Sequence, residues 1–559
     1  MNFENEAAKY PSIILNDRQV CDLEMLMIGG YHPLKGYMTQ KQYKNCLKDM
    51  YIDKKVLFPI PITLSINLKT KDELRHSNFV TLKHNTGLPL CILKIEDIYE
   101  YNVEKEANSC IGCYDLNHPY IKILQEEYNS GYTFNIGGEI KHFKEVPHYD
   151  FLDYRKTPNE TKEIFRKKGW KNIIGFQTRN PMHRSHYELT KYALSQVYES
   201  NLLISPCVGI TQSCDIDYYT RVKCYIKLMN YYDAENVQLN LLNFPMRMYG
   251  PRSALFHAII RKNYGCTHFV VGRDHAGPSY KKENGDDFFE PYAAQELLQE
   301  YADVIGIIPI VSKMIVYTES IVGEDCKYQI IDNVDKKKYS ILKLSGTQQR
   351  KILQEGKELP DWFTFPLVKQ ELQENFLPLH KQGFCVYFYG LSGSGKSYIS
   401  NYLKIKLQEI TNRKITLLDG DIIRTHISKG LGFSKEDRSI NVQRIGYIAS
   451  EIVKHNGICI VSNIAPYADD RKFNKNLISS VGNYIEVLVN TPLEVCEERD
   501  CKGLYHLARK GVLTEFTGIS DPFEKYSHED IELDGSDTID NNLELLISYL
   551  KNKCLILDN

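Results

Sequence analysis

The sequence predicts a multidomain α/β protein: a β-rich first domain, two later domains built on parallel sheets, and a small mixed segment between those two. Its 559 residues, at about 150 residues per domain, suggest three or four domains. Short strands and turns fill residues 1–150, and apolar strands alternate with helices from about residue 160 and again from residue 384. Such alternation implies parallel sheets covered by helices on both faces.

The elements can be placed in chain order from these patterns. Residues 56–66 (VLFPIPITLSI) are β-rich with prolines that suit a sheet edge, and turns are expected at Gly29-Gly30 and His32-Pro33. A helix is expected at 186–194 (HYELTKYAL), and residues 312–370 are mixed. The expected buried strands are 172–176 (NIIGF), 202–210 (LLISPCVGI), 237–242 (VQLNLL), 268–272 (HFVVG) and 384–390 (FCVYFYG). The resulting domain boundaries are 1–150, 151–311, 312–375 and 376–559.

Composition excludes several classes of protein. The 69 Lys and Arg residues nearly balance 71 Asp and Glu, with a net charge of −2, which excludes a polybasic nucleic-acid coat and an acidic tail. No apolar run approaches the roughly 18 residues of a membrane span, and the first residues show no secretory signal. The 15 cysteines are sparse and irregularly spaced, and the one Cys-x-x-Cys, at Cys110 and Cys113, lacks a second pair at zinc spacing. We therefore expect a cytoplasmic protein with free thiols and neither membrane nor nucleic-acid partners.

A phosphate-binding loop follows the strand at 384–390. GLSGSGKS fits the pattern G-x-x-x-x-G-K-[ST], and a helical segment comes directly after it. Its glycines let backbone N–H groups surround phosphate oxygens at a helix N-terminus. Lys396 can reach the β- and γ-phosphates of ATP, and the Ser397 hydroxyl can hold Mg²⁺ through the nucleotide. The expected ATP-binding residues are Gly390, Leu391, Ser392, Gly393, Ser394, Gly395, Lys396 and Ser397.

Residues 417–449 bring carboxylates and arginines together soon after this loop. A kinase needs a carboxylate near the acceptor hydroxyl, and Asp421 is the candidate base. An anionic acceptor would also need guanidinium groups, for which Arg424 and Arg438 are candidates. From spacing alone, a solvated charged face is the alternative interpretation.

The motifs LDGDIIR, SKGLGFSKEDR, NIAPY, KGLYHLARKG and FTGI resemble those of the adenylylsulfate (APS) kinase family, over residues 380–559. The resemblance implies transfer of the γ-phosphate of ATP to the 3′-hydroxyl of APS, giving PAPS. The residues that it implies for APS binding are Asp421, Arg424, Phe433, Arg438, Asn441, Ile464, Ala465, Lys502 and Phe516. In this sequence Ala465 stands where some members have Ser, and Glu515 replaces a small residue.

A second polar cluster follows the strand at 172–176. QTRNPMHRSH, at 177–186, opens a helix with His183 and His186 on one face of its first turn, near Arg179. During attack on an α-phosphate, imidazoles and a helix N-terminus would stabilise the charge on the phosphoryl oxygens, while an arginine holds the attacking anion. Zinc ligation and an unliganded pair of surface histidines are the alternatives. The spacing H-x-x-H lacks the Glu of a zinc-protease helix.

This cluster lies among motifs that resemble the ATP sulfurylase (sulfate adenylyltransferase) family. They are DIDYYTRVKCY at 215–225, MRMYGPRSALFHAIIRKNYGCTHFVVGRDHAGP at 246–278 and SGTQQR at 345–350, and the likeness covers almost everything before residue 370. The resemblance implies a PUA-like N-terminal domain, a Rossmann-like nucleotidyltransferase domain and a short third domain. The implied reaction joins sulfate to MgATP and releases APS and pyrophosphate.

The sulfurylase resemblance also implies roles for single residues. Its catalytic residues would be Thr178, Arg179, Asn180, His183 and His186; its sulfate contacts Gln177, Arg179 and Ala276; its ATP contacts Gln177, Thr178, Arg179, Asn180, Gly272, Arg273, Asp274, His275 and Ile315. The planar fork of Arg179 suits a tetrahedral oxyanion, and sulfate needs no general base because it is already deprotonated. This sequence departs from the family at Gln212-Ser213-Cys214, where many members have Lys-Pro-Gly, and at Ser253, where Glu is frequent.

Because the product of one predicted site is the acceptor of the other, a bifunctional sulfate-activating enzyme is expected. Two alternatives stay open: a C-terminal domain that binds PAPS as an allosteric module, as in filamentous-fungal sulfurylases, and a sulfurylase that runs in reverse to make ATP. In those fungal enzymes the phosphate-binding loop is degenerate, whereas GLSGSGKS is intact here. The expected partners are ATP, sulfate, APS, pyrophosphate and PAPS, with Mg²⁺ as cofactor. Both families form oligomers, so a homo-oligomer, dimer or hexamer, is expected.

Overall fold

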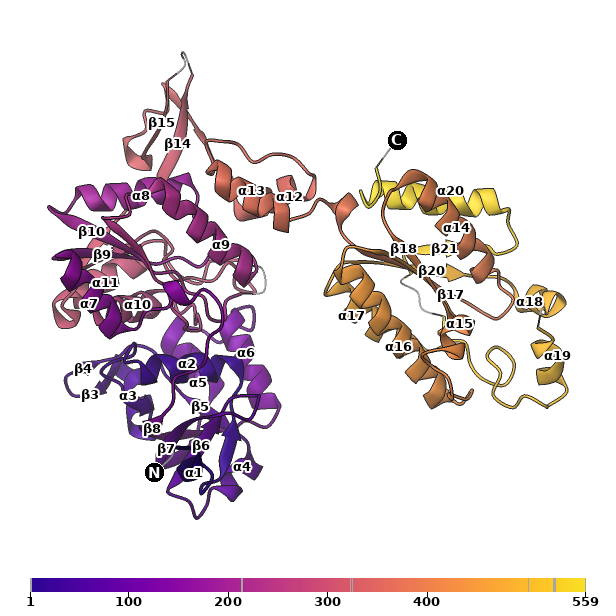
Figure 1. The fold of residues 1–559 in the computed structure, drawn as a ribbon, viewed down its shortest axis with the longest axis horizontal. Helices are drawn as coiled ribbons and strands as arrows, with labels where there is room; N and C mark the ends of the chain where they lie inside the picture. The colour runs from indigo at the N-terminus through magenta and orange to yellow at the C-terminus, as the bar shows by residue number, and fades with distance from the viewer. Residues whose placement is uncertain are drawn as a thin grey trace. The chain divides into compact units, whose positions relative to one another are not determined.

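The chain forms two compact units that together contain three large sheets. The computed structural model describes residues 3–212, 215–321, 323, 325–500, 502–525 and 529–557. The first unit comprises Met1–Gly346 and Leu359–Asn375, and the second comprises Thr347–Glu358 and Phe376–Asn559. In Figure 1 the second unit contains the orange and yellow end of the chain. The mixed α/β architecture predicted from the sequence is confirmed.

The N-terminal part of the first unit is built on a six-stranded mixed sheet with the order β1-β6-β7-β8-β2, in which β5 also pairs with β8. The predicted edge strand at 56–66 forms two short strands, because Pro59 and Pro61 cannot donate backbone hydrogen bonds between them. The strands of this sheet are β1 (Ser12–Ile14), β2 (Gly36–Tyr37), β5 (Leu64–Ile66), β6 (Phe79–Lys83), β7 (Pro89–Glu100) and β8 (Phe134–Phe143). A separate two-stranded sheet pairs β3 (Tyr51–Asp53) with β4 (Val56–Leu57). The helices are α1 (Phe3–Ala7), α2 (Asp17–Met27), α3 (Gln40–Asp49), α4 (Leu68–Glu73), α5 (Val103–Ile111) and α6 (Pro119–Asn129).

The central sheet is entirely parallel, with the order β11-β10-β9-β12-β13. Its strands are β9 (Asn172–Phe176), β10 (Ser200–Ile204), β11 (Val237–Leu239), β12 (His268–Val271) and β13 (Ile308–Val311). The helices are α7 (Pro158–Lys168), α8 (Arg184–Ser195), α9 (Tyr218–Leu228), α10 (Pro251–Asn263) and α11 (Ala293–Ile305). The predicted strands are confirmed, although β10 and β11 end earlier than expected. Since β9 lies between β10 and β12, the segments that follow these strands meet at one edge of the sheet.

A three-stranded antiparallel sheet follows, with β14 (Ile315–Ser320) between β15 (Cys326–Ile330) and β16 (Tyr339–Leu342). Strand β14 packs against α8, and α13 (Pro366–Asn375) packs against α9. Helix α12 (Gly346–Gln354) lies almost entirely within the second unit. This mixed segment therefore belongs partly to each unit.

The second unit is built on another fully parallel sheet, with the order β18-β19-β17-β20-β21. Its strands are β17 (Phe384–Tyr389), β18 (Ile415–Asp419), β19 (Ile458–Ser462), β20 (Asn483–Val489) and β21 (Ile531–Leu533). Its helices are α14 (Lys396–Ile410), α15 (Gly420–Thr425), α16 (Lys435–Lys454), α17 (Ala468–Ser479), α18 (Leu493–Arg499), α19 (Leu504–Arg509) and α20 (Ile539–Asn552). All residues of the central strand β17 are fully buried. Within the described part of the chain, no helix is long and apolar enough to cross a membrane.

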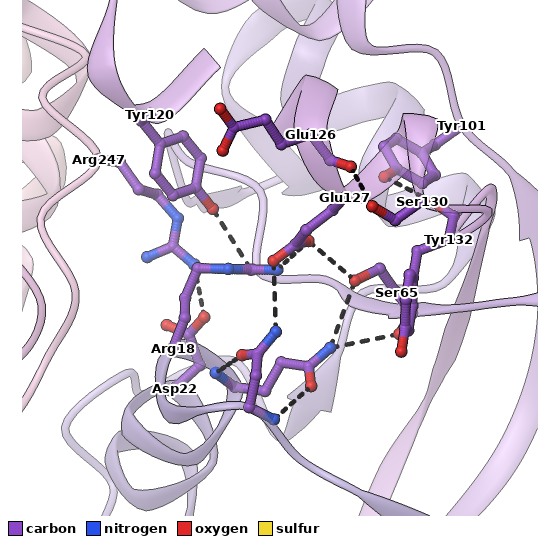
Figure 2. A network of polar contacts seen from close by, with 12 residues as sticks. Arg18, Asp22, Ser65, Tyr101, Tyr120, Glu126, Glu127, Ser130, Tyr132 and Arg247 are labelled. Carbon is purple, nitrogen blue, oxygen red and sulfur yellow. Dashed lines mark hydrogen bonds and ion pairs between the residues drawn. The ribbon is translucent and has the colours of Figure 1, made fainter. Parts of the chain in front are cut away.

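Two buried ion pairs connect distant segments of the first unit (Figure 2). Asp22, on α2, accepts a hydrogen bond of 2.7 Å from Arg247, and both side chains are almost fully buried. One turn earlier, Arg18 donates to Glu127 of α6 at 2.6 Å. Removing one partner of such a pair costs about 3–5 kcal/mol because the other charge stays buried. The Asp22–Arg247 pair therefore fixes α2 against the segment that leads into α10, and the Arg18–Glu127 pair fixes α2 against α6.

Candidate active sites

The C-terminal site begins at the loop between β17 and α14. Gly393 and Gly395 adopt φ angles of 74° and 102°, which side chains other than glycine rarely allow. The loop leads directly into the 15-residue helix α14, whose N-terminus carries a positive partial charge. The predicted strand–loop–helix context of the phosphate-binding motif is therefore present.

Lys396 and Ser397 open helix α14. The ammonium of Lys396 donates to the Leu391 carbonyl at 2.6 Å, and burial lowers its pKa to about 8. The Ser397 hydroxyl donates to a carboxylate oxygen of Asp419 at 2.9 Å and lies 3.3 Å from the Ser462 hydroxyl. Hydroxyl and carboxylate oxygens are ligands that Mg²⁺ prefers. Among the described residues, no group of three or more His, Cys, Asp or Glu is placed to hold a metal ion.

A cavity of about 1060 Å³ gathers most of the C-terminal candidates. The candidate residues that line it are Ser392, Gly393, Gly395, Lys396, Ser397, Asp421, Arg424, Phe433, Arg438, Asn441, Ile464, Ala465, Lys502 and Phe516. Three members of the phosphate-binding motif do not line it. Ser394 is fully buried, Gly390 lies at the end of β17, and Leu391 lines a separate cavity of about 530 Å³. All nine residues expected to bind APS therefore face one cavity.

An ion pair stands at the mouth of this cavity. The carboxylate of Asp421, at the start of α15, accepts a hydrogen bond from the ammonium of Lys502, and both side chains are more than half exposed. The backbone N–H of Asp421 donates to the Asp419 carboxylate at 2.9 Å, which fixes the turn between β18 and α15. Asp421 is thus accessible to a substrate and lies next to the Ser397–Asp419 pair.

Two arginines, Arg424 and Arg438, line the same cavity together with the ring of Phe433. Arg424 lies over the ring of Phe433 at 4.6 Å, and this ring is 65% exposed. Arg438 donates to the Phe433 carbonyl at 2.8 Å and also to the Thr517 hydroxyl and the Glu515 carbonyl. The wall therefore combines an exposed aromatic ring with guanidinium groups, which suits a ligand that is both planar and anionic.

The central site begins directly after β9. Arg179 donates to the Ser279 hydroxyl at 2.9 Å, and its Nε lies 3.7 Å from the Asp215 carboxylate. The Thr178 hydroxyl donates to the Asn180 carbonyl at 2.9 Å, which closes the turn. The side chain of Gln177 accepts a hydrogen bond from Arg261. Four consecutive candidate residues are therefore held at the carboxyl end of the central strand.

His183 and His186 lie on the first turn of α8, as predicted. The backbone N–H of His183 donates to Nδ1 of His186 at 3.2 Å, and the ring of His183 packs on Phe363 at 4.1 Å. Burial lowers the pKa of His186 to about 4, so this imidazole is neutral at pH 7. It can donate or accept a hydrogen bond at that pH without carrying a charge.

The loop after β12 contributes the other central candidates, from Gly272 to Ala276. Nε2 of His275 lies 3.3 Å from Nδ1 of His257, and burial lowers the pKa of His275 to about 3. Arg273 pairs with Asp274 at 3.1 Å on the surface of this loop. The hydrogen bond from Arg179 to Ser279 connects the same loop to the β9 segment.

Three further sequence predictions concern positions around this site. Ile315 starts β14, outside the central sheet. The Ser253 hydroxyl accepts from the Tyr249 N–H at 2.9 Å, a local role at the start of α10. Ser213 and Cys214 lie outside the described residues, and the backbone N–H of Gln212 donates to Asp215 at 3.2 Å.

Sequence patterns missed several residues that shape the central site. Arg221 donates to the Arg179 carbonyl at 2.7 Å, and Arg261 donates to Gln177. Phe363 comes from a segment almost 180 residues after His183. These contacts join residues far apart in the chain, where spacing carries no signal.

Comparisons with known proteins agree with this arrangement. A PUA-like domain model matches residues 1–145, an ATP-sulfurylase model matches 152–375, and an adenylylsulphate kinase model matches 382–534. The chain is 41% identical over 537 residues to a sulfate adenylyltransferase of Aspergillus fumigatus, covering 95% of this chain and 92% of that protein. It is 40% identical over 536 residues to one of Phaeosphaeria nodorum, with the same coverage.

Solved structures extend the likeness to the whole fold. The structure of a hexameric APS kinase from Thiobacillus denitrificans superposes with a TM-score of 0.78 at 30% identity, covering 99% of this chain and 96% of that one. Similarity over the full length means that both units and their order in the chain are shared. The chain therefore belongs to the sulfate adenylyltransferase family, with an ATP-sulfurylase domain followed by an adenylylsulphate kinase domain.

Proposed function

We propose that the chain is a bifunctional enzyme that activates sulfate in two steps. The central site joins sulfate to the α-phosphate of ATP, releasing pyrophosphate and forming APS. The C-terminal site then transfers the γ-phosphate of a second ATP to the 3′-hydroxyl of APS, forming PAPS and ADP. The observation that carries the proposal is one cavity lined by five residues of the phosphate-binding motif, Lys396 and Ser397 among them, and by all nine residues expected to bind APS.

In the central site, Arg179 and Gln177 would hold sulfate together with the backbone of Ala276. The guanidinium fork of Arg179 fits an oxyanion, and its Nη1 is buried without a partner among the described residues. Attack by sulfate needs no base, so alignment and electrostatics must supply the rate. Thr178, Asn180 and the two histidines of α8 would donate hydrogen bonds to the phosphoryl oxygens. ATP would lie against the β9 segment, residues 272–275 and Ile315.

In the C-terminal site, Asp421 would accept the proton of the 3′-hydroxyl while Lys396 holds the transferred phosphoryl group. Arg424, Arg438 and Asn441 would bind the anionic part of APS, and Phe433 and Phe516 its adenine. Ser397 and Asp419 offer oxygen ligands that fit Mg²⁺ held through ATP. When bound, Mg²⁺ neutralises charge on the phosphates during transfer.

The remaining sequence predictions belong to the same proposal. We propose domain boundaries at residues 150, 311 and 375, a cytoplasmic location and a homo-oligomeric state. The relative from Thiobacillus denitrificans is described as hexameric, which supports a hexamer over a dimer.

A coupled assay tests the proposal directly. The purified chain receives APS and ATP, and PAPS and ADP are quantified. Rapid, equimolar formation of both products is expected. If no PAPS forms, and added PAPS instead binds and changes the response of the sulfurylase to sulfate, the second unit is an allosteric module. A separate reaction with sulfate and ATP should release pyrophosphate.

A further inference from the structure

Buried arginines in this protein fall into two groups. The described residues include six arginines that are less than 9% exposed. Four of them lie within 4 Å of a carboxylate: Arg18, Arg247, Arg438 and Arg471. For the other two, Arg221 and Arg261, the described part of the chain provides no ion pair. Both of these donate hydrogen bonds to the Gln177–Arg179 segment.

Arg261 is completely buried on α10, beside the central strand. Its Nε donates to the Ser205 hydroxyl at 3.0 Å, and its Nη2 donates to the Ser205 carbonyl at 2.5 Å and to the side-chain oxygen of Gln177. The guanidinium lies 5.4 Å and 5.9 Å from the ring centres of Phe244 and Phe269. Aromatic faces stabilise a cation but do not neutralise it, and burial lowers the pKa of Arg261 to about 10.

The central strand is shaped to admit this side chain. A Cβ atom at Gly175, two residues before Gln177, would lie 2.9 Å from Cγ of Arg261. That contact is closer than neighbouring side chains tolerate, so the glycine provides the space that Arg261 occupies beside β9. The rings of Phe244 and Phe269 would pack more favourably around an apolar side chain at position 261, because a buried charge without an ion-pair partner is costly. A role beyond packing is therefore needed.

A guanidinium group has donors only, so it can face only the carbonyl end of the Gln177 amide. The Nε2 end then points away, and its two contacts are long: 3.5 Å to the Thr178 carbonyl and 3.7 Å to the Met246 sulfur. A donor with such weak partners is ready to bind an oxyanion. We propose that Arg261 is a positioning residue for sulfate: it holds the side chain of Gln177 with its N–H groups toward the anion.

This inference rests on the proposed binding of sulfate at Gln177 and Arg179. The test is a double-mutant cycle in the full-length chain, following pyrophosphate release with varied sulfate and then varied ATP. Gln177→Ala and Arg261→Met should each raise the KM for sulfate about 10- to 100-fold, with a smaller change in the KM for ATP. Because Arg261 acts through Gln177, adding Arg261→Met to Gln177→Ala should raise it less than about threefold further.

Two milder variants cover the case in which Arg261→Met does not fold. Arg261→Lys keeps the charge but loses the fork, and Ser205→Ala removes one acceptor of the guanidinium; each should raise the KM for sulfate several-fold. Phosphorylation of supplied APS checks that the second unit is unaffected. Independent effects in the double variant, or equal changes in both KM values, would overturn the role of Arg261. If Gln177→Ala leaves the KM for sulfate unchanged, the proposed sulfate site itself is wrong.

Discussion

The two sites of this protein handle charge in opposite ways. In the central site the imidazoles of His186 and His275 are half-buried, and desolvation lowers their pKa values to about 4 and 3, so both are neutral at pH 7. In the C-terminal site an exposed carboxylate, Asp421, pairs with Lys502, and the pKa of Lys396 lies at about 8. The central site thus offers neutral imidazoles and guanidinium groups, whereas the C-terminal site includes one ammonium group, that of Lys396, which titrates near neutral pH.

This difference matches the chemistry that each site is proposed to perform. Sulfate attacks as an anion and transfers no proton, so the site needs no group that accepts one. The hydroxyl of APS must lose a proton when it is phosphorylated, so a carboxylate within reach is needed. Variants that separate the two activities therefore test whether each site works with its own residues.

Lys396→Ala should have the largest effect. Without its ammonium the phosphate-binding loop loses a cation that is held 2.6 Å from the Leu391 carbonyl, so PAPS formation should fall at least about 10³-fold. Sulfate-dependent release of pyrophosphate should remain unchanged. Both rates are measured on one preparation, with Lys406→Ala, on the exposed side of the same helix, as the control. Loss of both activities in a folded variant would contradict the claim that each site works with its own residues.

Arg179→Ala should remove the other activity, that of the central site, and should have the next largest effect. Sulfate would lose its guanidinium fork, and release of pyrophosphate should fall about 10²–10³-fold. Phosphorylation of supplied APS should stay within experimental error of the unchanged chain. Arg166→Ala, on the surface of α7, is a matched control because that side chain is 73% exposed. Sulfurylase activity that survives Arg179→Ala would remove the sulfate assignment.

Asp421→Asn tests whether the carboxylate of Asp421 accepts the proton of the APS hydroxyl. The amide keeps the shape and a hydrogen bond but cannot accept the hydroxyl proton, so kcat of the kinase should fall about 10²-fold. The KM for APS should change little, because Arg424 and Arg438 remain to hold the anion. Single-turnover measurements separate the chemical step from product release. A variant with unchanged kcat and raised KM would make Asp421 a binding residue rather than the base.

The residues of the C-terminal site could be predicted from sequence patterns better than those of the central site. The phosphate-binding loop depends on fixed offsets after a strand, so Gly395, Lys396 and Ser397 could be placed before the structure was known. The central cluster depended on its resemblance to a family, because H-x-x-H alone fitted an unliganded pair of surface histidines best. Its supporting residues stayed hidden: Arg261 contacts Gln177 across 84 positions, and no local period records such a contact.

In the fold, too, some elements could be predicted from the sequence and others could not. Buried strands such as β9 and β17 show continuous apolar runs, and both were placed correctly. The six helices that the structure describes between residues 3 and 130 were less visible, since they are short and separated by turns. Asp22 and Arg247 form a buried pair over 225 positions, which charge patterns along the chain cannot indicate.

The two activities should also respond differently to pH. Between pH 7 and pH 9 the kinase should lose about tenfold more of its kcat/KM than the sulfurylase. The charged form of Lys396 is lost as pH rises through about 8, so kcat/KM of the kinase for ATP should fall about tenfold between pH 7 and pH 9. Arginines hold the anions in the central site and stay charged over this range, so the sulfurylase profile should be flatter. Both profiles are recorded on the same preparation with the second substrate saturating. Parallel curves would contradict the assignment of this titration to Lys396.

Glu515→Gln should have the smallest effect, and the reason lies in the backbone. Arg438 is held by the carbonyl of Glu515, which the substitution leaves in place, while the Glu515 side chain is exposed at the rim of the cavity. An exposed carboxylate repels anionic APS only weakly, so its removal should lower the KM for APS by no more than about threefold, and less at high salt. A rise of tenfold or more would mean that the carboxylate itself contacts APS. In that case the kinase pocket, like the central site, would depend on fixed charge as well as on groups that exchange protons.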